Sequence, residues 1–247
     1  MTDEGWRLRC FASLPSTSDQ CVTLAAAGEP DGLAVLALRQ TAGRGSRGRG
    51  WESPSGNLYL SVLLRPEGLA TEVGRWALLA SVAVAEALAT LVPDRGALTL
   101  KWPNDVLLNH RKLAGILLDS AATPAGRLDW LVIGIGVNLR VAPPIPDRAA
   151  ACLAEIVDPP APEDFATVVL DRLAAWRVAL PADFARVRAA WLAQGQPIGS
   201  PMQFRHCDHV AQGTFEGLAE DGSLMMRTGG RVQAFATGEV LLPKTDN

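Results

Sequence analysis

The sequence predicts an α/β domain followed by a small β domain, and three observations support this. Short apolar runs typical of buried strands alternate with helical patterns as far as residue 195. One long stretch repeats apolar residues at helical spacing, which predicts a core helix. From Gln196 onward, short β-prone runs alternate with turns. We therefore expect domains over residues 1–195 and 196–247, the second a small β-barrel.

The expected elements follow from local patterns. Ser16 or Thr17 is a natural N-cap for a helix that begins after Pro15. Apolar runs bounded by turn residues predict strands over 33–38, 58–64, 98–102, 105–108, 113–119 and 130–135. The helical spacing places the core helix over 76–91, and two more helices, over 163–179 and 181–193, follow a proline-rich loop. Gly195 ends the last helix as a C′ glycine does.

Composition excludes several classes of protein. A chain of 247 residues with 48% hydrophobic and 20% charged residues is a packed globular protein. A net charge of -3 gives no general attraction to nucleic acid. Four scattered cysteines suit a reducing compartment, and neither a signal peptide nor an apolar run of membrane-spanning length is present. We expect a cytoplasmic protein without a membrane partner.

Lysine is rare in this chain. Only three of the 23 basic residues are lysines, and Lys101 and Lys112 lie within one short segment. The ammonium group on the flexible lysine side chain can stay in contact with a carboxylate while that carboxylate is converted into a phosphoanhydride. The planar guanidinium of arginine does this less well. The pair therefore indicates a site that handles carboxylate and phosphate. Chance survival of lysine in an arginine-rich chain is the alternative.

A glycine–arginine segment runs from Gln40 to Trp51. Its four glycines allow close backbone approach to a ligand, and Arg44, Arg47 and Arg49 suit phosphate or carboxylate. Trp51 at its end could cover a purine. The spacing fits neither a Rossmann nor a Walker motif. By composition, an ordered ligand loop and an RNA-contacting segment are about equally supported.

Asn104 and Asp105 follow Pro103 just past an expected strand. This placement suits contacts to a nucleotide or to Mg²⁺, although a plain Asx turn is the usual reason for such a triplet. Gly115 and Gly134 lie inside expected strands and Gly136 directly follows one, so an apolar ring could rest there on bare backbone. Packing of the sheet against a helix is the alternative explanation for these glycines.

His206 and His209 are plausible zinc ligands, with Cys207 and Asp208 between them. The sequence offers no second ligand pair, so we expect no metal site formed by the protein alone.

Together these segments resemble the biotin protein ligase family. The resemblance rests on the order and spacing of segments 16–18, 40–51, 101–105, 111–116 and 133–139. It implies a class II synthetase-like α/β catalytic domain with a central mixed sheet, and an SH3-like C-terminal domain. It also implies formation of biotinyl-5′-AMP from biotin and ATP with Mg²⁺, then transfer of biotin to a lysine of a biotin carboxyl carrier protein.

The resemblance also implies roles for individual residues. Lys112 and Arg44 are the expected catalytic residues. The expected biotin-binding residues are Ser16, Thr17, Ser18, Gln40, Arg44, Gly45, Ser46, Lys112, Gly115, Gly134 and Gly136. The expected ATP-binding residues are Arg47, Arg49, Trp51, Lys101, Asn104, Asp105 and Asn138.

Two positions depart from the family pattern. Ser46 stands where the loop usually has a second arginine, and Leu242 or a neighbour stands where bacterial members often have a nucleotide-contacting arginine. The residues before Trp6 leave no room for a winged helix-turn-helix, so we expect no specific DNA binding. The sequence leaves a homodimer open.

Two other functions remain to be weighed. A lipoate-protein ligase uses the same adenylate chemistry, but segments 40–51 and 101–105 together argue against it. A nucleic-acid-binding regulator using the glycine–arginine loop is disfavoured by the acidic balance of the chain.

Overall fold

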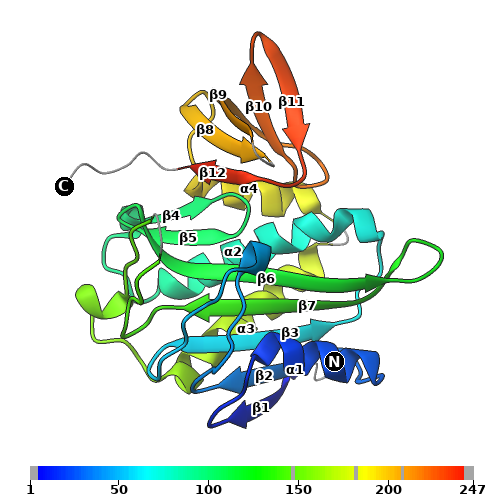
Figure 1. Ribbon diagram of the computed structural model, residues 1–247, viewed down its shortest axis with the longest axis vertical. Coiled ribbons are helices and arrows are strands. Elements are labelled where there is room, and N and C mark those ends of the chain that lie inside the picture. The colour runs from blue at the N-terminus through cyan, green and yellow to red at the C-terminus, as the bar shows by residue number, and fades with distance from the viewer. Residues whose placement is uncertain (1–4, 146–147, 181–182, 207–208, 242–247) are drawn as a thin grey trace.

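The computed structural model describes residues 5–145, 148–180, 183–206 and 209–241. A large sheet with helices on both faces forms the main body, and a smaller sheet lies at one end of it (Figure 1). The predicted α/β fold with a small C-terminal β unit is confirmed. Among the described residues, no helix is long and apolar enough to cross a bilayer.

The large sheet has seven strands in the order β1-β2-β3-β7-β6-β5-β4. Only β1 and β2 pair in parallel, so the sheet is mixed, as predicted. Its strands are β1 (Arg7–Phe11), β2 (Leu33–Ala37), β3 (Leu58–Leu64), β4 (Leu98–Lys101), β5 (Asp105–Leu108), β6 (Arg111–Ala122) and β7 (Leu128–Val137). β1 was not predicted from the sequence, and the strands predicted over 113–119 and 130–135 are shorter than the observed β6 and β7.

Side chains of the central strands are buried on both faces because helices cover both. Leu60 and Val62 of β3 point into the main core, which also contains α2 (Val73–Leu88), α3 (Pro162–Ala179) and α4 (Phe184–Gln194). Leu63 points to the opposite face and packs with α1 (Thr17–Ala26) in a second core. This double burial explains why these strands read as continuous apolar runs.

The C-terminal sheet is antiparallel, with its five strands in the order β11-β10-β9-β8-β12. Its strands are β8 (Pro201–His206), β9 (His209–Leu218), β10 (Leu224–Thr228), β11 (Arg231–Phe235) and β12 (Glu239–Leu241). Trp102 of the main body packs against Phe204 of β8, so the two sheets share buried contacts. The division at 195/196 stays a prediction, and α4 ends next to it.

Gly195 ends α4, but for a different reason from the one predicted. Its φ of -84° and ψ of -173° are extended rather than left-handed. A Cβ atom there would lie 2.5 Å from the ring of Trp191, one turn back along the helix. Glycine is therefore required by the close approach of Trp191 and not by a positive φ.

Candidate functional site

A patch of bare backbone lies on the sheet face that α1 covers. On β7, Val132 packs with α1, and because side chains alternate, Gly134 and Gly136 share that face. Gly115 of β6 pairs with Gly136 and widens the patch. A Cβ atom at Gly134 would lie 2.4 Å from the Ser18 hydroxyl. The glycines therefore form the floor of a cavity beyond the N-terminus of α1.

Buried polar groups form one wall of this cavity. The Ser16 side chain accepts from the Asp19 N–H at 3.2 Å, which confirms Ser16 as the N-cap. The Thr17 N–H and hydroxyl both donate to Gln40 Oε1, at 2.8 and 3.1 Å. Ser61 of β3 bonds the Thr17 hydroxyl at 2.8 Å. This network fixes the start of α1 against β3 and the loop that follows β2.

The loop from Gly43 to Trp51 crosses the same face of the sheet (Figure 1). Arg44 fastens it: its Nε lies 2.7 Å from Asp19 of α1, and one Nη lies 2.7 Å from Asp119 of β6. The hydrogen bonds that Arg44 donates to the Asp119 carboxylate are the main reason that the pKa of Arg44 is raised. In this arrangement Arg44 holds the loop over the cavity, and its catalytic role stays a prediction.

The ring of Trp51 rests on the glycine floor, where the sequence analysis expected a ligand ring. Ring atoms lie 2.7–2.9 Å from the Cβ position of Gly136, and one lies 3.1 Å from that of Gly115. The Trp51 Nε1 is buried without a hydrogen-bond partner. The cavity keeps only about 40 Å³ of free volume, and the Trp51 ring covers its floor. A ligand ring that lies on this floor therefore requires Trp51 to move.

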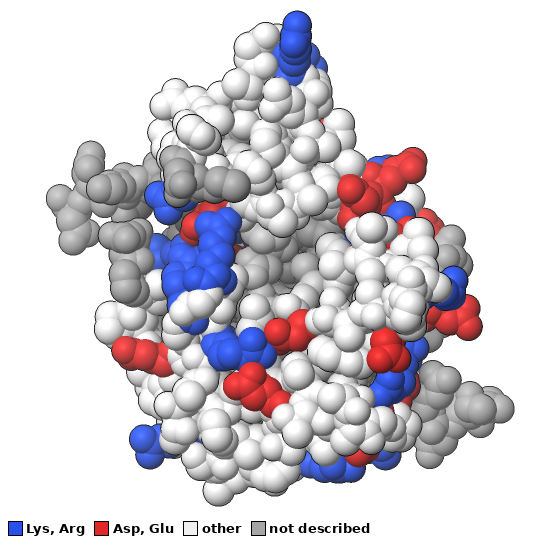
Figure 2. All heavy atoms as spheres, turned by 45° about the vertical axis from the view of Figure 1, so that its right-hand side comes forward, with Lys and Arg blue, Asp and Glu red and all other residues white. Residues whose placement is uncertain are grey.

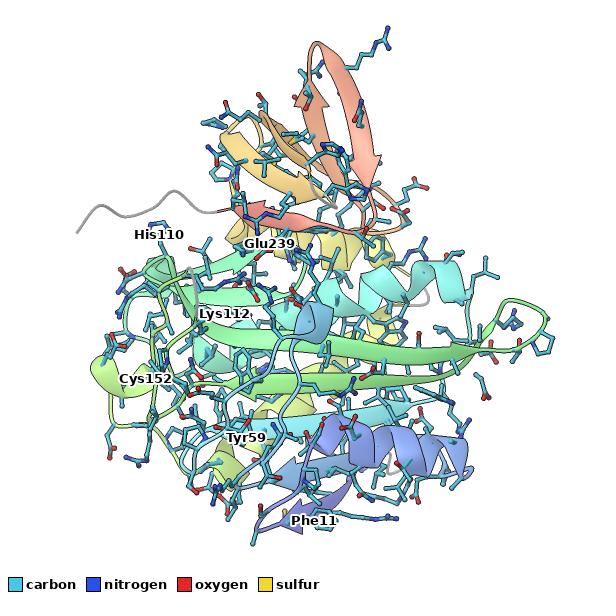
Figure 3. The ribbon with its side chains drawn as sticks, viewed as in Figure 1. Phe11, Tyr59, His110, Lys112, Cys152 and Glu239 are labelled. Carbon is cyan, nitrogen blue, oxygen red and sulfur yellow. The ribbon has the colours of Figure 1, made fainter. Side chains whose placement is uncertain are left out.

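Lys112 extends from β6 toward the Asp105 carboxylate, at 2.5 Å. Lys101 lies 3.1 Å and Arg148 3.3 Å from the same carboxylate, so three cations share one buried anion. Burial would raise the pKa of Asp105, but Lys112 and Lys101 outweigh it and hold that pKa below its ordinary value. Burial lowers the pKa of Lys112, against the pull of Asp105. In Figure 3, Lys112 lies between Tyr59 of β3 and Glu239 of β12.

Two further cavities adjoin the first. One, of about 330 Å³, is lined by Lys112, Arg49, Trp51, Asn138 and Arg148 among others. The other, of about 530 Å³, lies beneath β12 and is lined by residues that include Arg47, Arg49, Lys101, Asn104, Asp105, Arg148 and Glu239. Ser46 lines all three cavities, so they meet at the loop.

The structure brings together every residue predicted for the site. All eleven predicted biotin-binding residues line the first cavity. All seven predicted ATP-binding residues line one or more of the three cavities, with Trp51 and Asn104 also lining the first. Asn138 is buried, and its amide donates to the Ala151 carbonyl at 3.1 Å, holding the segment after β7 against the site. Their binding roles stay predictions.

Four polar or charged residues at the site were not predicted: Tyr59, Ser61, Arg148 and Glu239. Ser61 carried a usable signal, since it is the one small polar residue in β3; its hydroxyl bonds Thr17 in the cavity wall, and Tyr59 of the same strand lines the cavity. Arg148 and Glu239 carried none, because each is an ordinary charged residue outside the motifs. The structure places them together: Glu239 bonds Arg148 and also Arg47, the latter at 2.8 Å.

The departures from the expected pattern have different outcomes. Arg47, next to Ser46, adopts a left-handed backbone (φ 60°, ψ 38°) and directs its guanidinium to Glu239. Leu242 lies outside the described residues.

The two histidines considered as zinc ligands flank Cys207 and Asp208, which lie outside the described residues. His206 Nδ1 lies 2.9 Å from the Thr237 carbonyl oxygen. Within residues 5–145, 148–180, 183–206 and 209–241, no group of three acidic, histidine or cysteine side chains is placed to hold a metal.

Comparisons with known proteins agree with this geometry. The model of the biotin/lipoate A/B protein ligase family matches residues 11–138. A biotin–[acetyl-CoA-carboxylase] ligase of Paracoccus denitrificans is 37% identical over 83% of this chain and 88% of its own. One of Mycobacterium tuberculosis is 34% identical over 96% of this chain and 90% of its own.

Among solved structures, a biotin protein ligase of Aquifex aeolicus in complex with biotin and ATP superposes with a TM-score of 0.79 and 26% identity. The alignment covers 95% of this chain and 97% of that one. The match of the family model over more than half of the chain, with relatives that are biotin ligases over most of their length, establishes the family. The chain belongs to the biotin/lipoate A/B protein ligase family, among its biotin ligases.

Proposed function

We propose that this protein is an ATP-dependent biotin ligase that forms biotinyl-5′-AMP and transfers biotin to a lysine of a biotin carboxyl carrier protein. The observation that carries the proposal is the position of Lys112. It lines the polar, glycine-floored cavity on one side and the cavity containing Arg49, Trp51 and Asn138 on the other. A cation at this junction can contact both an acid and a phosphate.

The first cavity suits biotin in chemistry, and in shape once Trp51 has moved off the glycine floor. Without side chains at Gly115, Gly134 and Gly136, the floor then accepts a flat ring system closely, as it now accepts the Trp51 ring. The hydroxyl and amide groups of its wall, Ser16–Ser18 and Gln40, supply donors and acceptors for a cyclic urea. A ligand that places its ring there directs its acid tail toward Lys112.

The proposed first step joins two anions. A carboxylate oxygen of biotin attacks the α-phosphorus of ATP, the bond to the β-phosphate breaks, and pyrophosphate leaves with the electron pair. Positioning and positive charge dominate such a step, because no proton transfer is needed. Lys112 supplies charge between the reacting groups, and Lys101 and Arg49 supply it on the nucleotide side.

The proposed second step is acyl transfer. The neutral amine of the acceptor lysine attacks the biotinyl carbonyl carbon, an amide bond forms, and AMP leaves with the electrons of the anhydride bond. As the amide forms, the attacking nitrogen gives one proton to the departing AMP phosphate or to water. A low-pKa leaving group makes this step possible without a nucleophilic triad.

Mg²⁺ is expected with ATP, but the described side chains fit an all-protein magnesium site poorly. Asp105, the best-placed carboxylate, already contacts Lys101, Lys112 and Arg148. Glu239 is likewise surrounded by arginines. Because Mg²⁺ usually keeps several waters and binds through substrate phosphates, a nucleotide-borne ion is the better match. No step here depends on a magnesium ligand from the protein.

Biotin-dependent exchange of labelled pyrophosphate into ATP tests the proposal. Biotin, lipoate and octanoate are offered separately at equal concentrations, and exchange is expected with biotin. Exchange that requires lipoate or octanoate, with none from biotin, would identify the related lipoate-type activity instead. A cytoplasmic location stays a prediction, as does the carrier, which we expect to be the biotin carboxyl carrier domain of acetyl-CoA carboxylase or a related carboxylase. A homodimer stays open.

A further inference from the structure

One arginine reaches the site from a segment without any recognisable motif. Arg148 lies in the proline-rich stretch after β7, and backbone bonds hold this stretch beside Lys112. The Lys112 N–H donates to the Ala149 carbonyl at 2.9 Å, and the Ala151 N–H donates to the Lys112 carbonyl at 2.9 Å. Arg148 is therefore fixed relative to the proposed catalytic lysine by the main chain on its C-terminal side.

The Arg148 side chain stands between the two nucleotide-side cavities and lines both. One Nη lies 3.3 Å from Asp105 in the large sheet, and the other bonds Glu239 in the C-terminal sheet. Its side chain is only 20% exposed, whereas that of Arg47 is 43% exposed and bonds Glu239 alone among the described acidic residues. Of the described arginines near β12, Arg148 is thus the one that contacts both Asp105 and Glu239.

The charges around these carboxylates do not balance. Six cations lie within 4 Å of the two carboxylates Asp105 and Glu239: Arg47, Arg49, Lys101, Lys112, Arg148 and Arg205. Four positive charges are therefore in excess at the junction of the two sheets, where basic side chains also gather on the surface (Figure 2). Crowded cations in a partly buried place repel each other, and a bound polyanion would relieve this.

We infer that Arg148 is a phosphate-binding residue of this enzyme and contacts a phosphate of ATP beside Lys112. The inference rests on the proposed adenylation activity and goes beyond the residues predicted for it. The guanidinium has five N–H donors in a planar fork. Two of its nitrogens bond Asp105 and Glu239, and the side chain that these bonds hold in place lines both nucleotide-side cavities.

Replacing Arg148 separates a phosphate-binding role from a structural one. In Arg148→Gln, Asp105 keeps Lys101 and Lys112, and Glu239 keeps Arg47. Neither carboxylate is left unpaired, so the fold should survive. Loss of one charge-assisted hydrogen bond to phosphate should raise KM for ATP about ten- to a hundred-fold. The dissociation constant of biotin and the melting temperature should stay near those of the native protein.

Two further variants sharpen the experiment. Arg148→Lys keeps the charge without the fork and should give a KM for ATP between those of the native protein and the glutamine variant. Arg140→Gln is the matched control, because Arg140 starts the same segment but pairs with Asp158, away from the cavities. Its KM for ATP should be native.

The measurements are steady-state pyrophosphate exchange with varied ATP, calorimetric titration with biotin, and thermal unfolding. The inference is overturned if Arg148→Gln has a native KM for ATP, or if its KM rises only together with weakened biotin binding and a lower melting temperature. A lysine variant no better than glutamine would also overturn it. Exchange by the native protein with biotin is measured first; if it is absent, the proposed function itself has failed.

Discussion

Replacement of Lys112 tests most closely how charge is used in this site. The Lys112 ammonium lies 2.5 Å from Asp105, and its Nζ is 3.1 Å from the Cβ position of Gly115. The Trp51 ring closes the other side, with its centroid 5.1 Å from that nitrogen. An arginine fork is wider than this space. We therefore expect Lys112→Arg to lose nearly as much adenylation rate as Lys112→Ala.

The size of the loss follows from the contacts. Losing one preorganised charge at a transition state costs a factor of about 10²–10³, or roughly 2.7–4 kcal/mol. Removing one partner of a buried ion pair can destabilise a fold by about 3–5 kcal/mol. Here the cost to folding should be smaller, because Asp105 keeps Lys101 at 3.1 Å and Arg148 at 3.3 Å. The rate should fall while the protein stays folded.

The assay is single-turnover formation of biotinyl-adenylate by native protein, Lys112→Ala and Lys112→Arg, with thermal unfolding of each. Arg111→Lys is the matched control, since Arg111 is the preceding residue of β6 and pairs with Glu155 outside the cavities. That control should keep the native rate. An arginine variant at position 112 with a near-native rate would refute the argument from space and charge.

Three further predictions follow from single contacts. Gly136→Ala adds a methyl to the floor that Trp51 ring atoms now approach to 2.7–2.9 Å. Because the biotin ring is proposed to lie on this floor after Trp51 has moved, overpacking of about 1–3 kcal/mol should weaken biotin binding measured by calorimetry; native affinity would contradict the glycine floor. Ser46→Arg should slow release of preformed biotinyl-adenylate in stopped-flow fluorescence by roughly ten-fold or more, because Arg47 is directed to Glu239; equal release would show that the native loop already holds the intermediate. The folded-state pKa of Asp105 is lowered, so the ionised Asp105 carboxylate stabilises the fold above the ordinary aspartate pKa near 4. This stabilisation is lost as pH falls below that value. Asp105→Asn should therefore flatten the acid decline in the free energy of unfolding, and an unchanged decline would contradict this prediction.

The sequence predicted the elements whose burial leaves a clear pattern. β3 and β5 have the predicted bounds because they are short, buried on both faces and ended by turn residues. β1 was missed because its sequence, Arg-Leu-Arg-Cys-Phe, shows only a weak pattern on a largely exposed edge strand. Its strand geometry comes from parallel pairing with β2, which no local signal encodes.

The residues of the site likewise fall into those that a local sequence pattern predicts and those that only the fold brings in. Glycines, the lysine pair and Gln40 stand in motifs, so the sequence could predict that they meet. Glu239 and Arg148 reach the site only because β12 pairs with β8 and backbone bonds anchor the segment after β7. The place of Trp51 on the glycine floor was equally out of reach, because it depends on the path of the loop that Arg44 fastens to Asp19 and Asp119.

The most direct test of the central claim is transfer of biotin to a carrier domain. The native protein is incubated with biotin, ATP, Mg²⁺ and a biotin carboxyl carrier domain, and the product is analysed by intact-mass and peptide mass spectrometry. We predict one added biotinyl group, on a single lysine, dependent on both biotin and ATP, and none when that lysine is replaced by arginine. Unmodified carrier under conditions where the native protein is folded would contradict the account.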